Sequence, residues 1–338
     1  MIEISEKKKE LFELMDDYWE DYKEKRDSDK PFIVKPSVPV IWFGDIEAYF
    51  SSRIRVVTVA INPSKEEFPK ACERFNGYKK LANKDTLSKS DKKNLYHMLN
   101  CYFKQEGNPY YDWFYNFDVQ CMGYMPEEYR ALYYVQPTTF TKPDQEGKMI
   151  EKFKQIYKDA FDENKKAVLN TAVHIDLLTA IATDPTWKDL GKLPMVESER
   201  EQMENLKNHT RIKNDVDTKL LTFIRQKYLS KPELFIKLLN ILNPNIVLIS
   251  TAAEPFKNVF KIESEPDFRF TQTRTRKNGT SIEVKELESY LVNNRLVIWG
   301  LSSNGSPFAF SDSDKNKGFS KIYSGYSFNN GNWELIKE

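Results

Sequence analysis

Short apolar runs alternate along this chain with longer stretches in which hydrophobic residues recur at helical spacing. The runs are rich in Val, Ile and Leu and lack a regular polar face, which is typical of strands covered on both sides in a parallel sheet. Hydrophobic residues three and four positions apart predict helices over residues 4–25 and between Pro232 and Pro244. The predicted strands are residues 55–61, 171–178, 246–249 and 295–299.

This order of strands and helices predicts an α/β fold. We expect a three-layer α/β/α arrangement with a central four-stranded parallel sheet and right-handed crossovers. Asn278-Gly279 lies between two strand-like stretches, residues 268–277 and 280–287, and predicts an inserted β-hairpin. Asn330-Gly331 predicts a second, small hairpin near the C-terminus.

The same pattern divides the chain into three parts. Residues 1–40 are expected to form an N-terminal helix and a linker, residues 41–310 the α/β/α domain, and residues 311–338 a tail that packs on the domain. Within the domain, residues 79–170 are expected to form a helical, aromatic-rich insert whose lysine-rich start is exposed. Residues 268–288 are expected to form a basic hairpin.

Composition narrows the class of protein. The chain has 338 residues, of which 40% are hydrophobic and 14% aromatic, so it can bury a large core. Its net charge of +1 means that any surface for nucleic acid must be local. The 3 cysteines lack CxxC spacing, which argues against a disulfide scaffold or a zinc site and favours the reducing cytoplasm. No apolar run approaches the roughly 20 residues that span a bilayer, so no membrane contact is expected.

Polar residues follow each predicted strand, and the carboxyl ends of parallel strands meet at one edge of the sheet. The first strand ends in AINPS, residues 60–64, where the amide of Asn62 offers both a donor and an acceptor. The second strand carries His174 and Asp176, which alternation places on the same side. A capped turn and a structural His–Asp contact would also explain these residues, so both interpretations stay open here.

Taken together, these motifs resemble the uracil-DNA glycosylase superfamily over roughly residues 42–310. AINPS is similar to the GINPG motif of the mismatch-specific uracil and thymine glycosylases, although Ala60 and Ser64 replace its glycines. Arg74-Phe75 resembles a pair that follows that motif, and HIDLL at residues 174–178 lies where the superfamily has a base-reading Asn. LSSNGSP at residues 301–307 corresponds to its Ser-rich DNA-binding loop but lacks the histidine of better-known branches. The wider pattern is also similar to uncharacterised bacterial relatives of these enzymes.

The resemblance implies a monomeric, monofunctional DNA N-glycosylase that flips a uracil-like, damaged or modified base out of DNA and hydrolyses its glycosidic bond. Base excision of this kind serves DNA repair or phage defence. It requires neither a cofactor nor a metal. Phe68 or Phe75 would stack on the base, and Asp176, in place of an amide, favours a base that offers a hydrogen-bond donor. The implied site comprises Asn62 for catalysis; Ile61, Pro63, Ser64, Phe68, Phe75, His174 and Asp176 for the base pocket; and Ser302, Ser303, Asn304, Arg274, Arg276 and Lys277 for DNA binding.

Two other functions stay open on the sequence. The loop after the fourth strand, residues 301–307, lacks the histidine of better-known glycosylase branches. This also suits a glycosylase-like fold that senses modified or damaged DNA without excising a base. Glu283 and Lys285, separated by one residue, suit a metal-dependent nuclease, in which a carboxylate holds the cation and a lysine assists the water.

Overall fold

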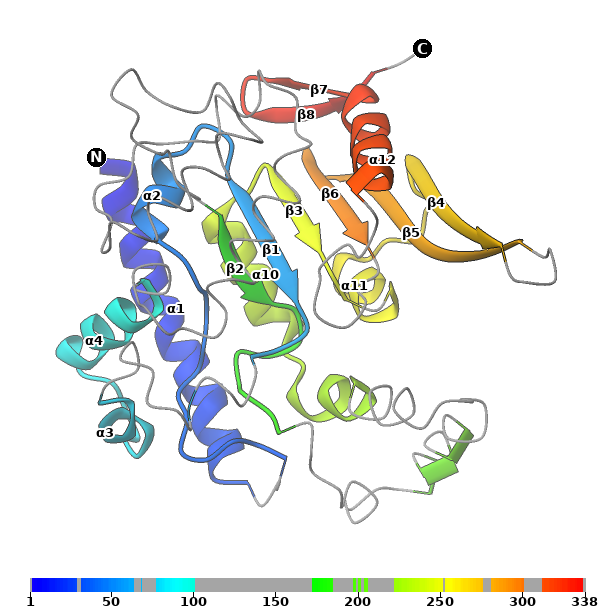
Figure 1. Ribbon diagram of the computed structural model, residues 1–338. Helices are drawn as coiled ribbons and strands as arrows, with labels where there is room; N and C mark the ends of the chain where they lie inside the picture. The colour runs from blue at the N-terminus through cyan, green and yellow to red at the C-terminus, as the bar shows by residue number, and fades with distance from the viewer. Residues whose placement is uncertain are drawn as a thin grey trace, which may run out of the picture.

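The computed structural model describes residues 2–28, 32–63, 68, 77–100, 172–184, 197–198, 200–201, 204–205, 222–251, 253–275, 281–300 and 312–336. Its centre is a six-stranded mixed sheet with the strand order β2-β1-β3-β6-β5-β4 (Figure 1). Four neighbouring strands are parallel: β1 (Val56–Ala60), β2 (Val173–Asp176), β3 (Ile246–Ile249) and β6 (Arg295–Gly300). The other two, β4 (Phe268–Thr275) and β5 (Ser281–Val292), are antiparallel and complete one side of the sheet.

The α/β class is confirmed, but the prediction of a four-stranded sheet with a separate inserted hairpin is wrong in its detail. The hairpin forms, yet β5 continues to Val292 and pairs with β6 from Leu287 onward. Asn293 and Asn294 have φ angles of 51° and 60°. Asn tolerates this left-handed conformation, which allows a two-residue turn to lead directly from β5 into β6. The hairpin therefore extends the sheet.

Two hydrophobic clusters cover the two faces of the sheet. On one face, Val57, Val59 and Val247 pack against α1 (Ile2–Arg26), α10 (Pro232–Leu242) and α11 (Ala253–Phe260). On the other face, Val56 and Leu248 pack against α12 (Asp312–Ser324) and the hairpin of β7 (Tyr326–Asn329) and β8 (Asn332–Leu335). Alternate residues of a strand point to opposite faces, so the unbroken apolar runs in the sequence serve both clusters.

The predicted helices and the C-terminal hairpin are confirmed. In α10, Pro232 occupies the first turn, and the residues expected on its apolar face are buried. The helix ends at Asn243, whose φ of 43° is left-handed. The hairpin of β7 and β8 turns at Asn330 and Gly331. None of the helices in the described part of the chain is long and apolar enough to cross a membrane.

The segment at residues 32–43 runs beside the outer edge of β2. Phe43 exchanges two backbone hydrogen bonds of 2.8 Å with His174. Farther along, Val40 N donates to Ala180 O and Val34 N donates to Ala182 O. These contacts cover the edge strand, which would otherwise leave its backbone groups unpaired. The sequence after β2, up to Asp184, is thereby held against the sheet.

The lysine-rich start of the predicted insert forms two helices, α3 (Tyr78–Ala82) and α4 (Lys89–Asn100). Lysines such as Lys79 and Lys93 are exposed as expected, but Leu81, Leu95 and Leu99 are buried in the main core. This part of the insert is therefore packed against the body of the protein. The short helix α2 (Ile46–Ser51) precedes β1, and Asp45 caps it.

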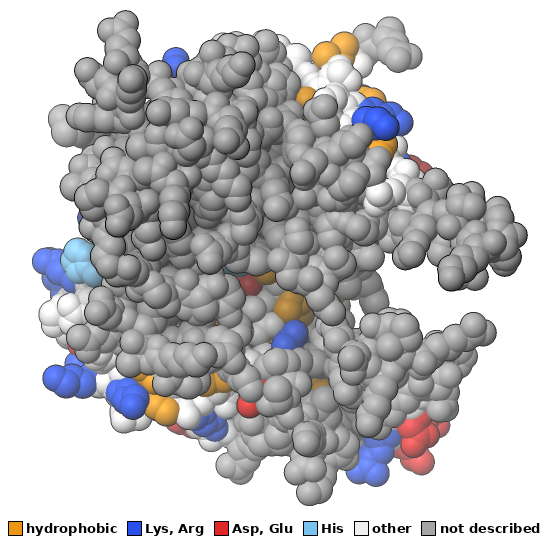
Figure 2. All heavy atoms as spheres, viewed as in Figure 1, with side chains coloured by type: hydrophobic (Ala, Val, Ile, Leu, Met, Phe, Trp, Pro, Cys, Tyr) orange, Lys and Arg blue, Asp and Glu red, His pale blue; other side chains and the backbone are white. Residues whose placement is uncertain are grey.

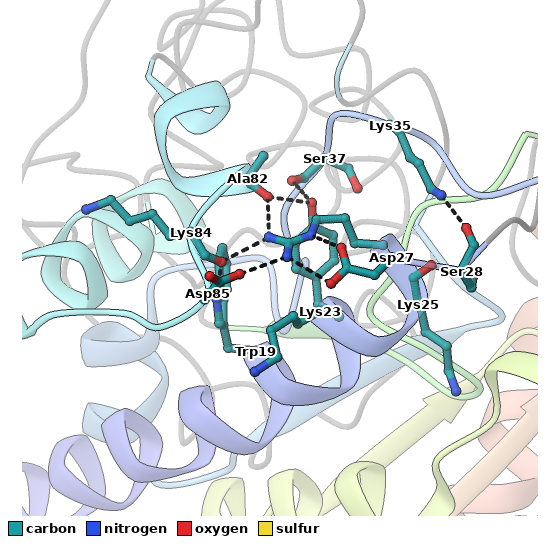
Figure 3. Close-up of polar contacts among 12 residues, drawn as sticks. Trp19, Lys23, Lys25, Asp27, Ser28, Lys35, Ser37, Ala82, Lys84 and Asp85 are labelled. Carbon is teal, nitrogen blue, oxygen red and sulfur yellow. Dashed lines mark hydrogen bonds and ion pairs between the residues drawn. The ribbon is translucent and has the colours of Figure 1, made fainter.

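Arg26, in the last turn of α1, joins that helix to the end of α3. Its Nη1 donates to Ala82 O at 3.1 Å and to Lys84 O at 3.0 Å, while its Nε donates to Asp27 Oδ1 at 2.7 Å. Figure 3 shows Ala82, Lys84 and Asp85 facing Asp27 across this junction. The guanidinium thus satisfies carbonyl groups that a helix end leaves without an intrahelical partner.

Candidate functional site

Polar side chains gather where β1 and β2 end. The two strands pair in register up to Ala60 and Asp176. Their pairing continues beyond both strands, because Leu177 N donates to Ala60 O at 2.8 Å and Leu178 N donates to Ile61 O at 3.1 Å. These bonds hold the turn that contains Asn62 beside the segment that follows β2.

Asn62 has a defined amide orientation. Its Nδ2 donates to Pro63 O at 2.6 Å and to Thr183 Oγ1 at 2.9 Å. A backbone carbonyl can only accept, so the atom facing Pro63 O must be the nitrogen. Oδ1 accepts no hydrogen bond from the residues that the structure describes, and Asn62 is half-buried. The amide therefore presents an acceptor oxygen away from its two partners.

Arg225 lies behind Thr183. It belongs to the helix at residues 222–229, and its Nε donates to Thr183 Oγ1 at 3.1 Å. Only 9% of Arg225 is exposed. Burial lowers the pKa of its guanidinium to about 10, and the negative charge of Asp176 opposes that shift. Arg225 is thus a buried cation two hydrogen bonds away from Asn62.

Asp176 and His174 lie on the same side of β2, as predicted. His174 Nδ1 shares a hydrogen bond of 2.8 Å with Thr58 Oγ1 on β1, and its Nε2 lies 3.7 Å from Asp176 Oδ1. Both carboxylate oxygens of Asp176 are buried and have no hydrogen-bond partner among the residues that the structure describes. Desolvation raises the pKa of Asp176, while the nearby His174 and Arg225 act to lower it.

The side chains of His174 and Asp176 are only 6% and 2% exposed, so both are buried. Figure 2 shows a few acidic, hydrophobic and basic side chains near the centre of the view, between residues drawn in grey. A neighbouring groove of about 600 Å³ runs between the helix at residues 222–229 and α11. Its lining includes Leu178, Gln226, Lys227, Ser230 and Asn258.

Models of known protein families, curated proteins and solved structures gave no match to this chain. The chemistry of the site therefore rests on its own residues. An amide that offers an oxygen acceptor can orient water or a ligand donor, and a buried cation beside a strand-end turn favours a ligand that carries or develops negative charge.

The structure places part of the predicted base pocket together. Ile61 and Pro63 flank Asn62, and Ile61 packs against the main core. Phe68 is 2% exposed and packs on Tyr78, with ring centroids 5.2 Å apart and an interplanar angle of 57°. In this arrangement Phe68 is a core residue, and its face is not open for stacking on a base.

Several predicted site residues cannot be placed. Arg274 lies in β4 opposite Ile282, and only its backbone belongs to the described structure. Glu283 and Lys285 of the nuclease hypothesis lie in β5, beside a register shift between Gln272 and Thr273. The predicted residues that lie outside the described structure are Ser64, Phe75, Arg276, Lys277, Ser302, Ser303 and Asn304.

The sequence did not identify Thr183 and Arg225. Thr183 lies in a polar turn after β2, 121 residues from Asn62, and Arg225 lies another 42 residues away. Arg225 comes from a segment with no recognisable motif. The one available signal was the polar turn itself, because the carboxyl ends of β1 and β2 share an edge.

Proposed function

We propose that this protein is a DNA glycosylase that hydrolyses the N-glycosidic bond of a flipped uracil-like, damaged or modified base and leaves an abasic site. The observation that carries the proposal is the orientation of Asn62, whose Nδ2 is held by Pro63 O and Thr183 Oγ1 while Oδ1 accepts no hydrogen bond from the described residues. The similarity of AINPS to the glycosylase motif supports the same assignment.

In this reaction the bond between C1′ and the base nitrogen breaks, and its electron pair leaves with the base. A water oxygen then forms the new bond to C1′ and loses a proton to solvent. The sugar carries positive charge in the transition state, so the attacking water needs orientation more than a strong base. Asn62 Oδ1 would accept a hydrogen bond from that water and aim its lone pair at C1′.

The surroundings suit this role. Asn62 lies in a turn held to the neighbouring strand by backbone bonds, so the amide belongs to a rigid part of the sheet edge. Arg225, whose Nε donates to Thr183 Oγ1, would place positive charge near the departing base, which develops negative charge. The antiparallel pair β4 and β5 extends from the sheet away from its centre (Figure 1). Its basic residues Arg274 and Arg276 would contact phosphates and position the strand.

The test is product formation on oligonucleotides that carry uracil, hypoxanthine or modified pyrimidines, with and without a chelator. The proposal predicts strand breaks that appear only after alkali treatment of the abasic site, at a rate that the chelator does not change. Breaks without alkali that the chelator abolishes would establish a nuclease instead. Tight binding to a modified base without any product would establish a sensor.

A further inference from the structure

We propose that Thr183 and Arg225 are positioning residues that hold the amide of Asn62 in its water-orienting geometry. The inference rests on the proposed function and extends it to two side chains that would touch neither the base nor the sugar. Asn62 donates one hydrogen bond to the next residue, Pro63, and one to Thr183, which lies 121 residues away in the sequence.

The bond to Pro63 O determines which amide atom faces inward. A rotation of the amide by 180° would bring Oδ1 to within 2.6 Å of that carbonyl oxygen, and two acceptors repel each other. Pro63 is the next residue in the same turn, however, and moves with Asn62. This contact alone therefore does not tie the amide to the rest of the protein.

The hydrogen bond to Thr183 connects the Asn62 amide to another segment of the protein. Thr183 is 1% exposed, and backbone bonds hold its segment beside residues 32–34, where Asp184 N donates to Phe32 O at 2.8 Å. The Thr183 hydroxyl accepts from Asn62 Nδ2 at 2.9 Å and from Arg225 Nε at 3.1 Å. Both of its lone pairs are then occupied by donors from different segments, so the hydroxyl acts as a fixed acceptor.

Arg225 fixes Thr183 in turn. A guanidinium only donates hydrogen bonds, and its charge makes the bond to Oγ1 stronger than one from a neutral donor. Asp176 supplies a negative charge that favours the charged form of Arg225 inside the protein. The segments of Asn62, Thr183 and Arg225, which are distant in the sequence, thus meet at the Thr183 hydroxyl. A small displacement of the Asn62 amide would misplace the water and reduce the rate strongly.

The experiment compares Thr183→Val, which keeps the shape but removes the hydroxyl, with Thr183→Ser, which keeps the hydroxyl. Single-turnover abasic-site formation and DNA affinity are measured for both. Thr183→Val should slow the chemical step by about 10-fold to 100-fold while DNA affinity changes little, and Thr183→Ser should restore most of the rate. Thr179→Val is the matched control, because Thr179 is buried in the same segment and, among the described residues, its hydroxyl accepts a bond from Ile181 N and none from Asn62 or Arg225.

A second readout does not depend on activity. In protein labelled with ¹⁵N at asparagine, the side-chain amide signal of Asn62 is assigned by its loss in Asn62→Ala. This signal should show slow proton exchange in the wild type and in Thr183→Ser, and faster exchange in Thr183→Val and in Arg225→Met. If Thr183→Val fails to fold, Thr183→Ala and Arg225→Met carry the same comparison.

The outcomes distinguish the role of Asn62 in the reaction from the positioning role of Thr183 and Arg225. Full activity in a folded Asn62→Ala protein would overturn the proposed role of Asn62 itself. A strong loss in Asn62→Ala, together with a wild-type rate and wild-type amide exchange in Thr183→Val, would overturn only the positioning role. A loss in Thr179→Val as large as that in Thr183→Val would show a general packing effect and would also overturn it.

Discussion

Replacing Asp176 by Asn should stabilise the protein at neutral pH. Among the described residues, neither buried carboxylate oxygen of Asp176 has a hydrogen-bond partner, and a charged group left unsatisfied costs more than the about 1–3 kcal/mol of a neutral group such as the amide of Asn. Because His174 and the positive charge of Arg225 offset part of this cost, we expect a gain in the free energy of unfolding of about 1–2 kcal/mol. For a chain of this length, that corresponds to an increase in Tm of roughly 1–3 °C.

The effect should depend on pH in a specific direction. Burial raises the pKa of Asp176 in the folded state above its value of about 3.9 in the unfolded chain. Between these two pKa values the folded state binds more protons, so the wild type loses stability as pH rises. Asn does not ionise, and the advantage of Asp176→Asn should therefore be small near pH 4 and grow toward neutral pH.

Asp91 provides a matched control of opposite sign. Its carboxylate accepts hydrogen bonds from Ser88 N at 3.0 Å and from Lys84 Nζ at 2.7 Å, and these partners lower its pKa. Its stabilising contribution is present above the unfolded pKa and is lost as pH falls through the folded pKa. Asp91→Asn should therefore lower Tm at pH 7, and this loss should shrink in acid.

Thermal unfolding of the wild type and both variants between pH 4 and pH 8 tests this reasoning. The two differences in Tm should have opposite signs at pH 7. The gain from Asp176→Asn should shrink toward pH 4, whereas the loss from Asp91→Asn should stay nearly constant over this range, because the folded pKa of Asp91 lies below its unfolded value. A lower Tm for Asp176→Asn at pH 7, unchanged across this range, would show that Arg225 and His174 stabilise the carboxylate more than burial destabilises it.

Two further variants test the N-terminal junction and the DNA-binding surface. Arg26→Ala should lower the free energy of unfolding by about 1–3 kcal/mol in urea melts, because two carbonyl groups lose a charged donor. Lys23→Ala should leave the free energy of unfolding nearly unchanged, because the ion pair of Lys23 with Glu20 is exposed and contributes little. Equal losses in the two variants would contradict the reasoning. Replacing Arg274 and Arg276 together should weaken DNA binding equally for all sequences and reduce the salt slope by about 2. Unchanged affinity and slope would show that the hairpin does not contact DNA.

The sequence predicted the elements that have a clear hydrophobic pattern, either a helical period or an unbroken apolar run. The apolar face of α10 and the parallel strands β1, β3 and β6 are visible as hydrophobic patterns, because burial acts on each residue of a regular element. The extent of the sheet was harder to predict. Pairing of β5 with β6 depends on the left-handed conformations of Asn293 and Asn294, and Asn-Asn is a weaker turn signal than Asn-Gly.

In the candidate site, too, residues in local patterns could be predicted from the sequence, and residues joined by long-range contacts could not. Asn62 and Asp176 were predicted because each lies at or just beyond the end of a buried strand, where side chains reach the sheet edge. Thr183 and Arg225 were missed because their contacts join segments far apart in the sequence and follow from the path of the chain after β2. Phe68 was one of two candidates for the stacking residue, together with Phe75. Its packing against Tyr78 depends on α3, which the sequence indicated only as an exposed insert.

The most direct test of the central claim is the single-turnover rate of abasic-site formation in wild type and Asn62→Ala, on the best substrate of the oligonucleotide panel. The account predicts a loss of about 10²-fold or more in the variant, with an unchanged fold and unchanged DNA affinity, because only the orientation of the attacking water is removed. A folded Asn62→Ala protein that forms abasic sites at the wild-type rate would contradict it.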